Sequence, residues 1–147
     1  EMVIRDWSSD VCSSDLTLTI PSTATKVITV GAYDARFDQA AAFSGRGYTR
    51  ATNQVKPDLV APGVEIMSCA PGGGYQVRTG TSMATPFVTG SAALLMQWGI
   101  TDGNDAYLYG EKMKAYLIRG ARRLPGFTAY PNPVLGWGAL CTADSIP

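Results

Sequence analysis

The residues of this sequence that can do chemistry lie in one stretch, Thr-Gly-Thr-Ser-Met-Ala-Thr-Pro, at residues 79–86. Gly80 lets the backbone turn sharply and lets another chain approach it closely. Ser82 begins a long apolar segment that predicts a helix, so its hydroxyl and N–H group would lie at the positive end of the helix dipole. A serine there can be a nucleophile whose N–H group stabilises a developing oxyanion. The alternative is an ordinary turn with a serine N-cap, which a bare Gly-x-Ser would favour.

The base that such a serine needs is missing from the sequence, because its 147 residues contain no histidine. A Ser-His-Asp enzyme is incomplete without an imidazole, and a serine without an adjacent base is a weak nucleophile at neutral pH. We therefore expect this polypeptide by itself to be inactive as an enzyme of this kind.

Composition describes a folded chain without a charge bias. Hydrophobic residues make up 46% and charged residues 16%, and twelve basic residues balance twelve acidic ones. This balance gives no electrostatic case for nucleic acid, and no apolar stretch is long enough to span a bilayer, so we expect neither a nucleic-acid nor a membrane partner. Cys12, Cys69 and Cys141 lack paired metal-ligand spacing, and we interpret Cys69 and Cys141 as buried thiols.

The first sixteen residues differ in character from the rest of the chain. They show neither helical nor strand periodicity and resemble translated sequencing-adapter sequence, so residues 1–16 are interpreted as a non-native leader, with a disordered native arm as the alternative. Residues 17–147 are then one partial domain. The sequence begins with Glu1 rather than Met, and we expect the true N-terminus to be missing.

Short elements surround the serine. A helix from Ser82 to Trp98 that is apolar almost all round belongs in a core, with its inner face expected at Ala84, Phe87, Val88, Ser91, Ala92, Leu95 and Met96. The other expected elements are strands at 27–31, 39–44, 64–69 and 75–78, a loop at 45–53, an extended piece at 56–63, a turn at 71–74, a helix at 111–119 with Met113, Tyr116 and Leu117 inside, and a tail at 131–147 anchored by Trp137 and Leu140.

The full octet resembles the nucleophile motif of the subtilases, and further matches stand in the order of that family. The resemblance covers roughly residues 19–147, and residues 104–121 are similar to clostridial subtilases related to spore-germination proteases. The matches are Val-Ile-Thr-Val-Gly-Ala at 27–32, Phe-Ser-Gly-Arg-Gly at 43–47, Lys-Pro-Asp-Leu-Val-Ala-Pro-Gly at 56–63, Gly-Ser-Ala-Ala-Leu-Leu at 90–95 and Leu-Gly-Trp-Gly at 135–138.

The resemblance implies a three-layer α/β/α fold with a mainly parallel sheet, present here only in its C-terminal half, and a serine endopeptidase acting through an acyl-enzyme. It implies the following roles: Ser82 as nucleophile and oxyanion N–H donor, the Thr81 hydroxyl as a second donor, Thr79 and Gly80 at the border of the substrate groove, Met83 beside the nucleophile, and Ile20 and Pro21, joined by a cis bond, at the floor of the substrate pocket. Phe87 stands where many relatives have a histidine outside the triad.

The resemblance implies no cofactor for the chemistry. Structural calcium is expected in the complete domain, with its principal ligands upstream, and the carbonyls of residues 21–26 are expected to form a weak cation site. The implied partner is a protein or peptide substrate, and the implied location is secreted or spore-associated in a bacterium. Because a parallel sheet needs both faces covered, we also expect the isolated 147-residue chain to expose apolar surface and to aggregate.

Two other functions remain open. A pseudoprotease would keep the fold as a binding or regulatory protein. A sedolisin would use a Ser-Glu-Asp triad and need no histidine, but Met83 and the Ala-Pro-Gly at 61–63 are more similar to subtilases.

Overall fold

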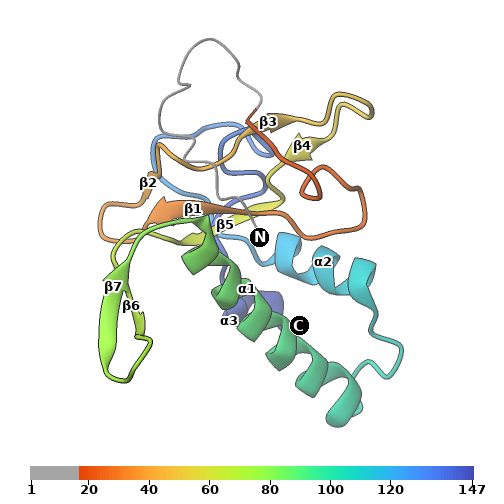
Figure 1. Cartoon of the computed structure of the whole chain (residues 1–147). Coiled ribbons are helices and arrows are strands. Elements are labelled where there is room, and N and C mark those ends of the chain that lie inside the picture. The colour runs from red at the N-terminus through yellow and green to blue at the C-terminus, as the bar shows by residue number, and fades with distance from the viewer. Residues whose placement is uncertain (1–16) are drawn as a thin grey trace.

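The computed structural model describes residues 17–147; the proposed leader at 1–16, with Cys12, lies outside the described residues. Strands occupy the first half of the described chain and helices the second (Figure 1). The elements are β1 (Val30–Asp34), β2 (Gln39–Ala40), β3 (Gly47–Tyr48), β4 (Val55–Lys56), β5 (Leu59–Pro62), β6 (Ile66–Cys69), β7 (Tyr75–Arg78), α1 (Thr81–Met96), the π-helical turn η2 (Gln97–Thr101), α2 (Gly110–Arg119) and α3 (Thr142–Ser145).

A three-stranded sheet in the order β2-β1-β5 forms the centre. β1 and β5 run parallel, with Val30 opposite Leu59 and Tyr33 opposite Pro62. The short β2 adds an antiparallel edge. A parallel pair covered by helices is the pattern of the α/β class, which the sequence predicts, although β1 and β5 are connected here through β2, β3 and β4 and not through a helix.

The two faces of this sheet are buried by different partners. Side chains alternate along a strand, so Ala32 and Ala61 face one way while Tyr33 and Val60 face the other. The first face packs beneath α1 and α2, which Figure 1 shows on the same side of β1. The second face packs on the irregular C-terminal segment, whose buried residues are Leu124, Leu135 and Ala139. Within residues 17–147 the third layer is therefore irregular chain, not helix.

The first strand starts later than expected. The apolar run predicted a strand over 27–31, but β1 begins at Val30 and continues to Asp34. The Val27 carbonyl instead accepts hydrogen bonds from Lys56 and Lys114, and the Thr29 carbonyl accepts from the Asp58 N–H. These backbone groups are held by side chains and by a neighbouring turn, so they do not extend the ladder.

The next strand is shorter than expected. Of residues 39–44, only Gln39–Ala40 are extended. The Ser44 N–H then closes a turn onto the Ala41 carbonyl, and the Ser44 hydroxyl accepts from the Ala32 N–H. The expected loop at 45–53 contains β3, which pairs with β4.

The predicted hairpin is confirmed. β6 and β7 pair antiparallel from Ile66 opposite Arg78 to Cys69 opposite Tyr75, and residues 71–74 form the turn. The hairpin is mostly exposed, so Cys69 at the end of β6 is exposed as well. Cys141 is half-buried. The interpretation of both cysteines as buried thiols is therefore wrong, because neither lies in the core.

The long helix packs by one stripe only. α1 buries Ala84, Val88, Ser91 and Leu95, which lie on one helical face toward β1 and β5. The expectation that Phe87 and Met96 lie inside is wrong, since they are 41% and 46% exposed. Within residues 17–147 neither side chain belongs to the buried core on the sheet, and both are only partly covered.

The second helix agrees with the sequence. α2 begins at Gly110, one residue before the predicted start, and buries Leu117, with Met113 and Tyr116 packed at the edge of the core. Trp98 meets Tyr116 edge-on with ring centroids 6.0 Å apart, which joins η2 to α2. In the described part of the chain no helix is both long and apolar enough to cross a membrane.

The tail is anchored by different residues from those expected. Leu140 packs at the edge of the first core, but Trp137 is 44% exposed. Leu135 and Ala139 are fully buried and hold the segment on the sheet. The aromatic residue predicted as an anchor lies in a tight turn that directs it outward.

Candidate active site

The turn that precedes Ser82 lies against the carboxyl end of β5. The Gly80 N–H donates to the Gly63 carbonyl at 2.8 Å. A Cβ on Gly63 would lie 2.6 Å from the Ala32 Cβ and 2.9 Å from the Gly80 carbonyl oxygen, so only glycine permits this approach. The start of α1 is thereby fixed at the carboxyl edge of the parallel pair β1 and β5, the edge at which open α/β sheets bind ligands.

Ser82 is the second residue of α1, and its side chain does not cap the helix. The N-cap residue is Gly80, so no side chain caps the start of the helix with a hydrogen bond. Ser82 is exposed, and within residues 17–147 its hydroxyl has no hydrogen-bond partner. The interpretation of this serine as an N-cap is therefore wrong. What remains is an unpartnered hydroxyl beside the free N–H groups and positive dipole of a helix start.

A cavity of about 300 Å³ opens beside this hydroxyl. Ser82, Met83, Pro86 and Phe87 of α1 form one wall, and the hairpin residues at 66–68 form the other. Apart from two serines, the lining is apolar. An apolar cleft with few polar groups is the usual form of a small-ligand or side-chain site. Met83, which follows Ser82 in the chain, also lines this cavity.

Thr79 and Thr81 flank the glycine without lining this cavity. The Thr79 hydroxyl accepts a hydrogen bond from the Glu65 N–H at 2.9 Å, so it ties the end of β7 to the turn before β6. Thr81 is half-buried in the first turn of α1, and its carbonyl accepts from the Thr85 hydroxyl at 3.1 Å. The structure thus places Thr81 next to the serine, and it gives Thr79 a structural bond.

Ile20 and Pro21 lie apart from the cavity lining. Their peptide bond is cis, as expected, and both are exposed, Ile20 by 89%. The Ala24 N–H closes their turn onto the Pro21 carbonyl at 3.0 Å. Among the described residues the structure does not bring this turn together with Ser82 in one pocket.

A model of the subtilase family matches residues 11–138. This chain belongs to the subtilase family. The match begins within residues 1–16, so the predicted boundary at residue 17 stays a prediction. The α/β fold class is confirmed by solved subtilase structures: the Clostridium perfringens CspB protease superposes with a TM-score of 0.83 at 50% identity, over 88% of this chain and 27% of that one.

Sequence relatives agree. The serine protease AprX of Bacillus subtilis (strain 168) is 34% identical over 89% of this chain and 32% of its own length. The membrane-bound transcription factor site-1 protease of Homo sapiens is 35% identical over 78% of this chain and 11% of its length. This subtilase chain therefore spans a minor part of its relatives. The likeness to a clostridial protease also agrees with the resemblance at residues 104–121.

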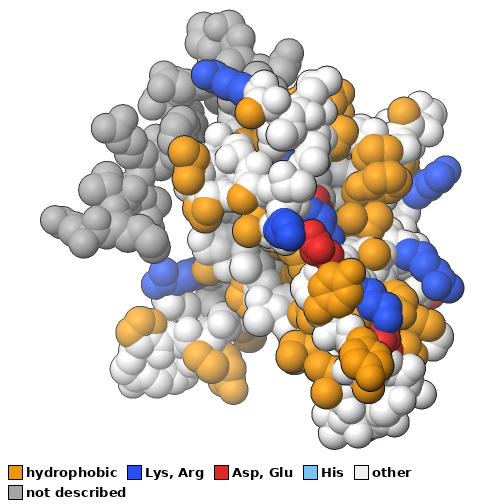
Figure 2. All heavy atoms as spheres, turned by 90° about the vertical axis from the view of Figure 1, so that its right-hand side faces the viewer, with side chains coloured by type: hydrophobic (Ala, Val, Ile, Leu, Met, Phe, Trp, Pro, Cys, Tyr) orange, Lys and Arg blue, Asp and Glu red, His pale blue; other side chains and the backbone are white. Residues whose placement is uncertain are grey.

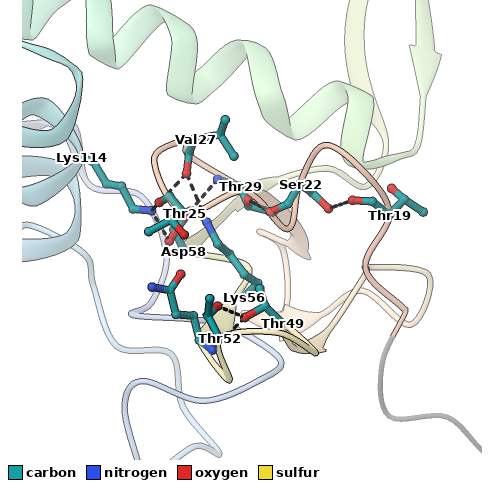
Figure 3. Close-up of polar contacts among 11 residues, drawn as sticks. Thr19, Ser22, Thr25, Val27, Thr29, Thr49, Thr52, Lys56, Asp58 and Lys114 are labelled. Carbon is teal, nitrogen blue, oxygen red and sulfur yellow. Dashed lines mark hydrogen bonds and ion pairs between the residues drawn. The ribbon is translucent and has the colours of Figure 1, made fainter.

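In the sequence, the Lys-Pro-Asp segment of this subtilase served only to indicate the family, and its part in a buried ion-pair cluster was not predicted. Figure 3 shows Lys56, Asp58 and Lys114 converging on one place. One carboxylate oxygen of Asp58 accepts from the Thr29 N–H at 2.7 Å and from Lys56 Nζ at 2.8 Å, and the other accepts from Lys114 Nζ at 2.7 Å. The sequence did contain a pattern that indicates such a cluster. Lys56 and Asp58 are two residues apart on a buried extended segment, and buried charges need partners.

Burial and charge act against each other on this cluster. The side chains of Lys56 and Asp58 are 1% and 6% exposed. Burial lowers the pKa of Lys56, since the ammonium loses water, and the bond to Asp58 opposes that shift. The cluster joins the loop after Pro21 to β5 and, through Lys114, to α2.

The cation site expected at the carbonyls of 21–26 does not fit these residues. The Thr25 carbonyl already accepts from Lys114 Nζ at 3.1 Å. Asp58 is the nearby carboxylate, and three donors use it. Across residues 17–147 no three acidic, histidine or cysteine side chains gather to hold a metal.

Proposed function

We propose that the complete protein hydrolyses peptide bonds in proteins or peptides, with Ser82 as the nucleophile that forms an acyl-enzyme. One observation supports this above the others: Ser82 is exposed, its hydroxyl is unpartnered among the described residues, and the residue lines an apolar cavity at the start of α1. A serine with a structural role would cap the helix or donate its hydroxyl hydrogen to a neighbouring carbonyl, as the hydroxyls of Thr85 and Ser91 in the same helix do.

The oxyanion would be held by the same helix start. Attack by the Ser82 hydroxyl turns the substrate carbonyl oxygen into an oxyanion, and the N–H group of Ser82 is aimed outward at the first turn, where it has no helical acceptor. The adjacent Thr81 hydroxyl is a candidate second donor. Thr79 and Gly80 would border the bound substrate strand through their backbone, since the Thr79 side chain is used by Glu65.

The base has to come from another part of the protein. No residue of this chain is a histidine, and a serine without a base is a poor nucleophile. We propose that the imidazole and its orienting carboxylate lie outside these residues. Ile20 and Pro21 would then contribute to a substrate pocket completed by that part. A bacterial protein that is secreted or spore-associated remains our expectation from the resemblance.

The test uses the complete open reading frame and a fluorophosphonate probe, which reacts only with an activated serine. We expect labelling of the wild-type protein and loss of labelling in Ser82→Ala. Ser68→Ala is the matched control, because Ser68 is also exposed and lines the same cavity from the hairpin. Labelling should persist in that control.

Absence of labelling in the wild-type protein would contradict the proposal and favour a pseudoprotease. Labelling that survives Ser82→Ala but not Ser68→Ala would move the nucleophile to the hairpin.

A further inference from the structure

Several oxygen atoms converge in the loop that comes after Pro21. The carbonyl oxygens of Thr25 and Val27 and one carboxylate oxygen of Asp58 all lie within hydrogen-bond distance of Lys114 Nζ, at 3.1, 3.0 and 2.7 Å. Lys56 Nζ approaches the same group from the sheet and donates to the Val27 carbonyl at 3.2 Å. We call these three oxygens the oxygen cradle. Figure 3 shows Lys114 reaching it from α2.

Two backbone carbonyls and one carboxylate are the kind of ligands that hard cations such as Ca²⁺ and Na⁺ prefer. A lysine ammonium is also a compact cation, and it has three N–H donors. Lys114 meets three acceptors, so each of its donors has a partner. The ammonium therefore satisfies the cradle as a bound cation would.

Local charge excludes a second cation. Lys56 and Lys114 carry two positive charges against the one negative charge of Asp58, and the three side chains are 1%, 16% and 6% exposed. A metal ion entering this place would meet two ammonium groups at short range with little water between them. Like charges at such distances repel strongly in a medium of low dielectric constant.

We propose that Lys114 is a built-in cation, which holds the loop at residues 22–29 on β5 and α2 so that this loop needs no metal ion. Its removal leaves an oxygen cradle that takes Na⁺ or Ca²⁺. The inference is independent of whether Ser82 is a nucleophile. It reverses the expectation of a weak cation site here, because the side chain from α2 occupies the ligands.

Hydrogen exchange measured by mass spectrometry on the complete protein tests this locally. The reporters are the Ala24 N–H, bonded to the Pro21 carbonyl at 3.0 Å, and the Thr29 N–H, bonded to Asp58 at 2.7 Å. Three buffers of equal ionic strength are compared: choline chloride with EGTA, NaCl with EGTA, and CaCl₂. A peptide from α1 is the internal reference, so that cations bound elsewhere are recognised by their effect on both peptides.

In the wild-type protein we expect the same exchange rates at residues 22–29 in all three buffers. In Lys114→Ala we expect these amides to exchange on the order of tenfold faster in choline with EGTA, and to recover protection in Na⁺ or Ca²⁺. Arg119→Ala is the matched control, since it removes the same charge from an exposed position of the same helix and leaves the cradle intact. It should behave as the wild type.

Three results would overturn the proposal. EGTA could speed hydrogen exchange at residues 22–29 of the wild-type protein and leave the α1 peptide unchanged, which would show that a metal ion is bound at this loop. This comparison uses the wild-type protein alone, so it tests the proposal even if the variant does not fold. Lys114→Ala could keep wild-type protection in choline, which would show that the ammonium holds nothing. Its lost protection could also fail to return with either cation, which would show that the oxygens are not a cation site.

Discussion

Asp58 accepts hydrogen bonds from one backbone N–H and two ammonium groups in a place that is almost closed to water. The three donors stabilise the charged form of this carboxylate, and the carboxylate in turn provides the counter-charge for the two lysines. Neutralising it leaves Lys56 buried without a counter-ion, which is costlier than losing an exposed pair. A charged residue, two positions after a lysine, therefore contributes to the stability of this part of the fold.

We expect Asp58→Asn to reduce the free energy of unfolding by about 3–5 kcal/mol, the range for breaking a buried ion pair by removing one partner. The measurement is urea unfolding of the complete protein. Asp38→Asn is the control, because Asp38 pairs with Arg122 at the surface at 2.8 Å. That change should reduce the free energy of unfolding far less than Asp58→Asn, because solvent screens an exposed pair. Equal losses in the two variants would contradict the prediction.

Met83 lies beside Ser82 in the cavity lining. Oxidation of its thioether to the sulfoxide adds a polar oxygen next to the attacking hydroxyl. If the complete protein is active, we expect hydrogen peroxide to lower its turnover and Met83→Leu to remove most of that sensitivity. Met67→Leu is the control, because Met67 lines the opposite wall and is 69% exposed. Unchanged sensitivity in Met83→Leu would contradict the placement.

Among the helices and strands, the sequence predicted those whose formation depends on residues close together in the chain. The β6–β7 hairpin and α2 were recognisable because a glycine-rich turn and an amphipathic repeat act within a few residues. The start of β1 was not, because the backbone before Val30 is bonded to side chains from residues 56, 58 and 114, which only the tertiary fold brings near.

The candidate site shows the same division. The octet around Ser82 is contiguous, so the sequence indicated both the serine and its helix start. The pairing of Lys56 with Asp58 had a local signal in their spacing, but the hairpin wall of the cavity and the approach of Lys114 to Asp58 join distant segments and had none. The inner face of α1 was misjudged because an all-round apolar helix does not reveal which stripe meets the sheet.

The approach of Gly63 to Gly80 makes a prediction about how the elements position Ser82. In Gly63→Ala the new Cβ would lie 2.9 Å from the Gly80 carbonyl and 2.6 Å from the Ala32 Cβ, so the turn before α1 must move. We expect a loss of about 1–3 kcal/mol in unfolding free energy, as for overpacking, together with slower probe labelling at Ser82. Gly110→Ala, where nothing described lies within 4 Å of the new Cβ, should label at the wild-type rate. Wild-type labelling in Gly63→Ala would show that the contact does not position the serine.

The connection between η2 and α2 makes a prediction about pH. The ammonium of Lys112, 2.6 Å from the Asp105 carboxylate, and the Tyr116 hydroxyl lower the pKa of Asp105. Because the folded pKa lies below the unfolded value of about 3.9, this stabilisation is fully present above the unfolded value and is lost as pH falls through the lower, folded pKa. The gap in Tm between the wild type and Asp105→Asn should therefore be largest near neutral pH and should narrow as the solution is acidified below the unfolded pKa. A gap that does not change with pH would contradict the assignment.

At the scale of the whole molecule, the described chain leaves one side of α1 open. Phe87, Leu94 and Met96 are 41%, 51% and 46% exposed, and η2 adds Ile100 at 45%. Figure 2 shows hydrophobic side chains gathered at the surface on the side that carries α2 and the connection before it. Tyr107 and Tyr109 of that connection are 88% and 59% exposed. Exposed large apolar side chains gathered on a surface normally meet a partner or more of the same domain.

These side chains stay in contact with water when no further protein covers them. We therefore expect the 147-residue chain, expressed alone, to bind the dye ANS strongly, to aggregate and to melt without a cooperative transition. Leu94→Gln with Met96→Gln should reduce ANS fluorescence and aggregation, since the change removes exposed apolar area from α1. Thr85→Gln with Thr89→Gln is the control: it alters two exposed positions of the same helix that are already polar, and it should leave both signals unchanged. A sharp, reversible thermal transition of the unmodified chain, with little dye bound, would mean that the sheet, α1 and the C-terminal segment already form a complete core and that the open face of α1 needs no cover.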